Sequence, residues 1–117
     1  MAIKKEIRLK VYNKYNGHCA YCGKEIEYKD MQVDHFIPKG IGYSGEDLDT
    51  LENYMPACRR CNHYKRANSL EGWRKMIEEI PLKLERDSYI YRVGIDYGFY
   101  EKPERQKVKF YFEMEEV

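Results

Sequence analysis

Two kinds of residue in this sequence have the types and spacing that chemistry requires. Four cysteines form two Cys-x-x-Cys pairs, and an acid–histidine pair lies between them in the short apolar run 33–38. A two-residue gap lets one turn supply two thiolates, and Zn²⁺ takes four such ligands in a tetrahedron. Gly23 follows the first pair, where a metal-binding turn often needs a positive φ. The sequence therefore predicts a structural zinc held by Cys19, Cys22, Cys58 and Cys61.

The acid–histidine pair, Asp34 and His35, could take part in hydrolysis. A histidine can accept and release a proton near neutral pH, so His35 is a candidate general base. Asp34 and Asn62 offer oxygen atoms, which are the ligands that a hard ion such as Mg²⁺ prefers. Basic side chains near the second cysteine pair could hold phosphate groups as charge-assisted donors. The candidates for such phosphate contacts are Arg59, Arg60, Lys65 and Arg66.

Each of these residues also has a purely structural interpretation. A histidine in an apolar run is more often a packed core residue than a catalyst, and an acid near a cysteine cluster is often a helix cap. His18 precedes the first cysteine pair, but four thiolates already fill a zinc shell, so we expect it to lie outside that shell. His63 is an alternative to Asn62 as a ligand. Runs of charge are often only solvated helix faces.

Composition indicates one folded domain over 1–117. The net charge of +1 hides an uneven distribution, since residues 55–75 hold six lysines and arginines against one acid, and residues 1–15 hold five against one. Such basic segments could meet a polyanion. Charged residues make up 35% of the chain, and we see neither an apolar membrane span nor an apolar signal core. We therefore expect an intracellular, cytoplasmic protein that does not use a membrane.

The first half of the chain is predicted to form a helix, two strands and a loop. Apolar residues recur every four positions over 3–16, and Gly17 suits the end of that helix. Residues 24–28 and 31–37 look like two short strands that pair as a hairpin. Three glycines and a proline over 38–45 predict a loop beside the candidate site.

The second half is predicted to be mainly helical, with a strand at its end. We expect a helical turn within 47–54, a basic helix over 58–67, a helix over 70–84 that breaks or kinks at Pro81, and a strand over 107–115. Periodicity over 89–97 fits both a strand and a helix that Gly98 would stop. The secondary structure of this segment is therefore left open.

A geometric difficulty follows from placing Asp34 and His35 on one strand. Successive side chains of a regular strand point to opposite faces, so the two cannot aim at one phosphate unless the strand ends, bulges or twists there. We therefore predict an irregular strand at this pair. Pro38 and the glycines after it make such a distortion plausible.

The joint pattern resembles the HNH endonuclease family, the zinc-stapled branch of the ββα-metal nucleases. It consists of Cys19-x-x-Cys22, Asp34-His35-Phe36-Ile37-Pro38, Asn53 and Cys58-x-x-Cys61-Asn62-x-x-Lys65. The resemblance covers about residues 5–68. It implies that His35 is the general base, that Asp34 and Asn62 bind a catalytic Mg²⁺ or Mn²⁺, and that Asn53 braces the loop beside the base. The zinc on the four cysteines is structural in that family.

The expected fold is α+β, a zinc-bound ββα core over about 5–68 with an N-terminal helix and a helix and strand extension over about 69–117. The expected function is a metal-dependent endonuclease that hydrolyses double-stranded DNA with His-activated water, and the resemblance implies a bacterial or phage origin. With one site per chain, cutting both strands takes two binding events or a homodimer. The alternative function is a non-catalytic zinc-ribbon module that binds nucleic acid or a protein.

Overall fold

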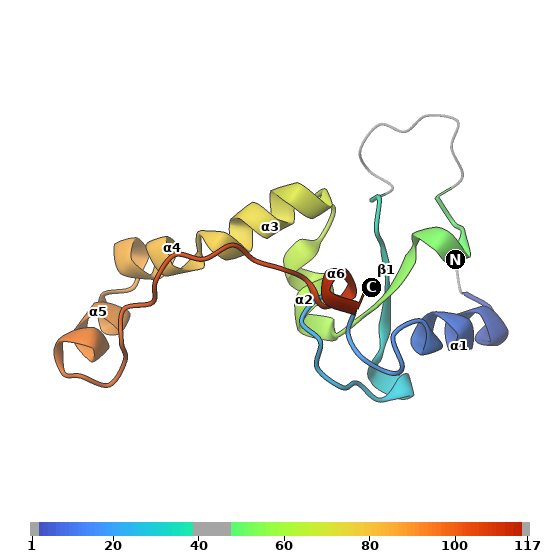
Figure 1. The fold of residues 1–117 in the computed structure, drawn as a ribbon, viewed down its shortest axis with the longest axis horizontal. Coiled ribbons are helices and arrows are strands. Elements are labelled where there is room, and N and C mark those ends of the chain that lie inside the picture. Colours follow the sequence, from blue (N-terminus) through green and yellow to red (C-terminus); the bar gives the residue numbers. More distant parts are fainter. Residues whose placement is uncertain (1–2, 39–47, 116–117) are drawn as a thin grey trace. The chain divides into compact units, whose positions relative to one another are not determined.

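The fold comes from a computed structural model, which describes residues 3–38 and 48–115. The chain divides into two compact units, one formed by residues 1–70 with 109–117 and the other by residues 71–108 (Figure 1). We call them the metal-site unit and the helical unit. The assignment of the whole chain to a single domain stays a prediction. None of the helices in the described ranges is both long and apolar enough to cross a membrane.

The metal-site unit is built on two short antiparallel strands followed directly by a helix. β1 and β2 pair in continuous register, from Gln32 opposite Ala57 to His35 opposite Tyr54. The elements of the unit are α1 (Lys5–Asn13), the 3₁₀ turn η1 (Tyr28–Asp30), β1 (Gln32–His35), the 3₁₀ turn η2 (Leu51–Asn53), β2 (Tyr54–Ala57), α2 (Arg59–Lys65) and α6 (Tyr111–Glu115). This order of strand, strand and helix beside a cysteine cluster confirms the predicted α+β fold class.

The predicted hairpin between 24–28 and 31–37 is wrong. Glu25 makes only an isolated bridge with His18, and residues 28–30 form a 3₁₀ turn instead of a strand end. β1 pairs instead with β2. The sequence did not predict β2 as a strand, because β2 contains a proline and directly follows η2, the helical turn that was correctly predicted. All four residues of β2 are buried, whereas the segment 24–28 is mostly exposed. Pairing of β1 with β2 therefore buries more apolar surface than pairing of β1 with 24–28 would.

The predicted irregularity at Asp34 and His35 is also wrong. Asp34 lies opposite Met55 and His35 opposite Tyr54, so the ladder is continuous through both residues. The strand then ends at His35, and residues 36–37 form a bend. Asp34 is buried and His35 partly exposed, as the alternation of a strand requires, and the end of the strand at His35 is the stated condition under which both side chains could still serve one phosphate.

Packing around the first cysteine pair uses two glycine positions. Gly17 follows α1 with φ of +77°, and Gly23 has φ of +82°, as predicted for the metal-binding turn. A Cβ atom on Gly23 would lie 2.7 Å from Cδ1 of Tyr111. Only glycine combines this φ with so close an approach of α6.

The helical unit contains α3 (Leu70–Glu78) except for its first residue, and all of α4 (Ile80–Asp87) and α5 (Tyr89–Asp96). The predicted break near Pro81 occurs, because Pro81 lies in the first turn of α4, where its missing N–H costs nothing. The segment 89–97, left open by periodicity, is helical over residues 89–96, which form α5. The Ser88 side chain accepts a hydrogen bond from the backbone N–H of Tyr91, which caps this helix, and Gly98 follows it with φ of +81°.

The strand predicted over 107–115 is wrong, since Tyr111–Glu115 form α6. The Glu113 carboxylate accepts a hydrogen bond from the backbone N–H of Phe110 at 2.8 Å, and the Phe110 carbonyl accepts one from the N–H of Glu113. This reciprocal pair caps a helix start. The alternation of apolar residues instead reflects the burial of Phe110 and Phe112 within the metal-site unit. Most of the predicted loop at 38–45 lies outside the described residues.

Candidate active site and metal centre

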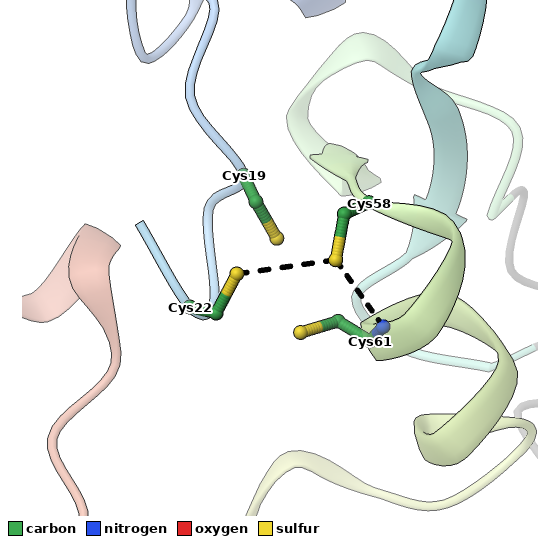
Figure 2. Close-up of side chains that lie close together, drawn as sticks. All are labelled: Cys19, Cys22, Cys58 and Cys61. Atoms are coloured by element: carbon green, nitrogen blue, oxygen red, sulfur yellow. Dashed lines mark hydrogen bonds between the residues drawn. The ribbon is translucent and has the colours of Figure 1, made fainter. Parts of the chain in front are cut away.

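The four cysteines come together as the sequence predicts. Their sulfur atoms all lie within 4.8 Å of one another, with Cys19 and Cys22 on the loop after α1 and Cys58 and Cys61 at the start of α2 (Figure 2). The Cys58 sulfur caps α2 by accepting a hydrogen bond from the N–H of Cys61 at 3.4 Å. His18 is not one of the four. It stacks on Tyr111 with ring centroids 5.3 Å apart.

The spacing and ionisation of these thiols fit a zinc ion. Ideal Zn–S bonds place tetrahedral sulfurs about 3.8 Å apart, and the Cys22 and Cys58 sulfurs are 3.9 Å apart. A hydrogen bond from Cys61 lowers the pKa of Cys19 to about 4. The same hydrogen bond raises the pKa of Cys61, and burial raises that of Cys22. Without a cation Cys19 therefore ionises easily whereas Cys22 and Cys61 resist ionisation, and a central positive charge would favour the thiolate form of all of the ligands.

Asp34 lies inside the unit, between the first cysteine pair and α2. The residue is 5% exposed, and its Oδ2 accepts a hydrogen bond from the Tyr21 hydroxyl at 2.6 Å. Burial raises the pKa of Tyr21, with the negative charge of Asp34 acting in the same direction, so the phenol stays protonated and donates. The Lys65 ammonium lies 3.1 Å from the same Oδ2. Asp34 is thus a buried carboxylate with both a hydrogen bond and a counter-ion.

Lys65 does not lie on the surface, where a contact with phosphate was predicted. It is fully buried, and its ammonium also donates to the backbone carbonyl of His35 at 3.1 Å. A charge held in this way is not presented to a phosphate on the surface. We therefore correct the prediction that Lys65 contacts the nucleic-acid backbone. Lys65 joins α2 to the end of β1 and neutralises Asp34.

His35 lies at the open end of β1, on the face opposite Asp34. Its Nε2 is 2.9 Å from Oδ1 of Asp49, and the two side chains are 26% and 29% exposed. The edge of the His35 ring meets the Tyr54 ring, with centroids 5.4 Å apart and planes at 84°. Asp49 was missed because no local spacing connects it to His35. The two are brought together only by the pairing of β1 with β2.

The Asn53 side chain forms hydrogen bonds with Ile37 and with Leu48, which are far apart in the chain. Its side-chain oxygen accepts a hydrogen bond from the N–H of Ile37 at 2.8 Å, and its amide donates to the carbonyls of Ile37 and Leu48 at 3.1 and 3.0 Å. Its own carbonyl accepts a hydrogen bond from the N–H of Phe36. These contacts have the geometry of a brace beside His35.

Lys14 supports the same region from α1. Its ammonium donates to the carbonyls of Leu51 and Tyr54 at 3.1 and 2.7 Å. Burial lowers the pKa of Lys14, although the negative charge of Glu52 opposes this effect. The turn that carries Asn53 is therefore held by a lysine from the N-terminal helix, which sequence reasoning did not assign.

Asn62 faces β1, whereas Arg59, Arg60 and His63 on the same helix are exposed. Asn62 Nδ2 donates to Oε1 of Gln32 at 2.6 Å, so this hydrogen bond does not use Oδ1, the atom that could bind a cation. His63 is exposed and lies elsewhere, in a surface hollow of about 410 Å³. The hollow is lined by basic residues: Lys24, Arg59, Arg60 and His63.

Comparisons with known proteins agree with this arrangement. Residues 19–68 match the family model of the HNH endonuclease. The chain is similar to the CRISPR-associated endonuclease Cas9 of Corynebacterium diphtheriae, with 33% identity over 79 residues, 65% of this chain and 7% of that protein. It is also similar to the Septu protein PtuB of Bacillus thuringiensis, with 36% identity over 64 residues, 53% of this chain and 24% of that protein.

A solved structure shows the same relationship. The Type II-C Cas9 enzyme from Actinomyces naeslundii matches with a TM-score of 0.51 and 29% identity, over 59% of this chain and 8% of that one. The chain thus spans less than a quarter of each of these relatives. The segment that matches the family includes both cysteine pairs, Asp34, His35, Asn53 and Asn62. Residues 19–68 are therefore an HNH endonuclease domain, as the resemblance in the sequence predicted.

Proposed function

We propose that this chain is a metal-dependent endonuclease that hydrolyses phosphodiester bonds in DNA with water activated by His35. The observation that carries the proposal is the partly exposed pair of His35 and Asp49 at the end of β1, within the segment that matches the HNH endonuclease family. A histidine oriented by a carboxylate and open to solvent is the arrangement of a general base.

The proton path follows from the contacts of His35. When Nε2–H donates to Asp49, Nδ1 carries the lone pair and can take a proton from water. The imidazolium that results is stabilised by the Asp49 carboxylate next to it. The Asn53 hydrogen bonds hold the backbone that follows His35, which limits the positions that the ring can adopt.

Asp34 and Asn62 are the residues that we assign to a catalytic divalent ion. A bound Mg²⁺ or Mn²⁺ supplies positive charge that stabilises the phosphorane-like transition state and the leaving oxygen. Asp34 contributes a carboxylate whose described contacts use Oδ2, and Asn62 contributes the amide oxygen that does not take part in its hydrogen bond to Gln32. Both groups are hard oxygen ligands of the kind that these ions prefer.

The substrate-binding part of the proposal rests on the exposed basic residues of α2. Arg59 and Arg60 line the basic hollow with Lys24 and His63, and Arg66 is exposed at the end of the helix. These groups suit the phosphates of a DNA backbone. Double-stranded DNA as the substrate and a homodimer that cuts both strands are parts of this proposal. So is an intracellular site of action in a bacterium, since both curated relatives are bacterial proteins.

The test is nicking of a supercoiled plasmid by the full chain with Mg²⁺ or Mn²⁺. The His35→Ala variant should lose roughly 10²- to 10⁴-fold in rate, the usual contribution of a general base. His18→Ala is the matched control, because it removes a partly exposed histidine of the same unit that has no assigned role in the site, and it should keep most of the activity. Equal nicking by His35→Ala and the unaltered protein would refute the mechanism. No nicking by any of the proteins would favour the non-catalytic zinc-ribbon module.

A further inference from the structure

The C-terminal residues 109–115 lie more than forty residues beyond the segment that matches the HNH endonuclease family. They nevertheless belong to the metal-site unit. The N–H groups of Tyr111 and Phe112 donate to the carbonyls of Tyr21 and Ala20, at 3.0 and 2.8 Å. The chain therefore returns after the helical unit to bind the loop between Cys19 and Cys22.

Aromatic packing stabilises the contact between these C-terminal residues and the loop that carries Tyr21. The Tyr21 ring meets those of Phe110 and Phe112 edge to face, with centroids 5.6 and 6.1 Å apart. Tyr21 is 3% exposed and Phe110 is 2% exposed. Phe112 also meets Phe36 edge to face at 5.7 Å. Such pairs add to the burial energy and also fix ring orientation.

The hydroxyl of the ring held in this way reaches Asp34. Tyr21 donates to Asp34 Oδ2 at 2.6 Å, a short hydrogen bond to a charged acceptor. The ammonium of Lys65, on α2, lies 3.1 Å from the same oxygen. Two donors on Oδ2 restrict the rotation of the carboxylate, and so restrict the direction in which Oδ1 points. An ion pair alone would be less directional, because an ammonium tolerates many approach angles.

We propose that Tyr21, held by the C-terminal residues Phe110 and Phe112, is a positioning residue that orients the Asp34 carboxylate for the divalent ion. This inference rests on the proposed function, since it takes Asp34 as a ligand of that ion. It assigns a role to a C-terminal segment outside the family match and connects the cysteine cluster to the acid by one side chain. Sequence order alone gives no sign of this connection, because Phe112 is 78 positions from Asp34.

The principal test is Mn²⁺ binding by titration calorimetry on the full, zinc-loaded chain. Tyr21→Phe removes one hydroxyl and keeps the packed ring. We expect Mn²⁺ to bind roughly tenfold more weakly, the lower end of what outer partners of metal ligands contribute. The zinc content of Tyr21→Phe should not change. Its nicking rate should fall at low Mn²⁺ and recover when the Mn²⁺ concentration is raised. Phe112→Leu should weaken Mn²⁺ binding in the same direction, by less.

Tyr12→Phe is the matched control. Tyr12 donates its hydroxyl to the Ile26 carbonyl at 2.8 Å in the same unit, away from Asp34. Mn²⁺ binding by Tyr12→Phe should equal that of the unaltered chain, and equal weakening in both variants would overturn the inference. So would Mn²⁺ binding by Tyr21→Phe that is as tight as in the unaltered chain, or tighter.

Asp34→Asn separates the two proposals. If Asp34→Asn weakens Mn²⁺ binding and Tyr21→Phe does not, the positioning role of Tyr21 fails and the proposed metal site remains. If Asp34→Asn leaves Mn²⁺ binding unchanged, Asp34 is not a ligand, and the metal site and the inference fall together.

Discussion

The two compact units bury different kinds of side chain. In residues 71–108, all of which the structure describes, only Trp73 and Gly94 are buried. The same unit exposes many large apolar side chains, among them Leu82, Leu84, Tyr89, Ile90, Val93, Tyr97, Phe99 and Tyr100. The metal-site unit instead buries polar groups, namely Asp34, Asn53 and Lys65, each with a described hydrogen bond or ion pair.

This difference shows where the chain needs exact geometry. A buried charge is costly unless a partner is correctly placed, so the pair of Asp34 and Lys65 requires β1 and α2 to meet in one arrangement. The helices of the other unit depend mainly on local signals, such as the Ser88 cap and Pro81 in the first turn of α4. Substitutions should therefore have large effects in the first unit and small ones in the second.

The largest effect should come from removing the metal ligands. Cys58→Ser leaves three thiolates, and because structural zinc contributes about 10–16 kcal/mol in small zinc domains, the metal-site unit should unfold. Zinc content and hydrogen exchange of the amides of α2 measure this, and the amides of α4 and α5 should keep their exchange rates. His18→Ala is the control and should retain zinc. An unchanged cooperative melt of Cys58→Ser would contradict a structural zinc.

The next largest effect should come from breaking the buried ion pair. Lys65→Met keeps the length of the side chain but leaves the Asp34 carboxylate without its counter-ion, which should cost about 3–5 kcal/mol of unfolding free energy. Urea denaturation measures the change. Lys83→Met on α4 removes an exposed lysine from the other unit and should change stability by less than about 0.5 kcal/mol. If both substitutions lower the free energy of unfolding by similar amounts, the two units do not differ in their sensitivity to substitution.

A smaller effect on stability, but a clear one on activity, is expected at Asp49. Asp49→Asn should lower the nicking rate by roughly 10- to 100-fold, as for other groups that orient a functional histidine. Its contribution to folding should stay below about 1 kcal/mol, because the pair with His35 is partly exposed. Asp87→Asn removes the exposed carboxylate that pairs with Arg86 and should keep full activity. Nicking by Asp49→Asn at the normal rate would show that Asp49 does not position His35.

The smallest effect is expected on the exposed apolar face of α5. Ile90 is 74% exposed, so Ile90→Ser should change the free energy of unfolding by less than about 0.5 kcal/mol. The rate of plasmid nicking should stay within about twofold, because RT ln 2 is only about 0.4 kcal/mol of activation energy. Thermal denaturation and the nicking assay provide the two measurements. A large loss of nicking would show that the helical unit takes part in the activity, and a large loss of stability would show that this face is packed in the folded protein.

The sequence by itself determined the features that depend on neighbouring residues. Two Cys-x-x-Cys pairs predicted the cysteine cluster, and helix signals predicted α2, the turn that ends at Asn53 and the break at Pro81. Each of these rests on a ligand spacing, a cap or a missing N–H that acts within a few residues. The family resemblance added the expected order of strand, strand and helix.

Only the tertiary structure decided what lies next to Asp34 and His35. β1 pairs with β2 and not with the segment just before it, which brings Asp49 to His35 and Lys65 to Asp34. The C-terminal residues form a helix whose aromatic neighbours hold Tyr21, where alternation alone had predicted a strand. These contacts join residues far apart in the chain, and their free energy comes from burial and from paired charges that exist only once the fold is complete.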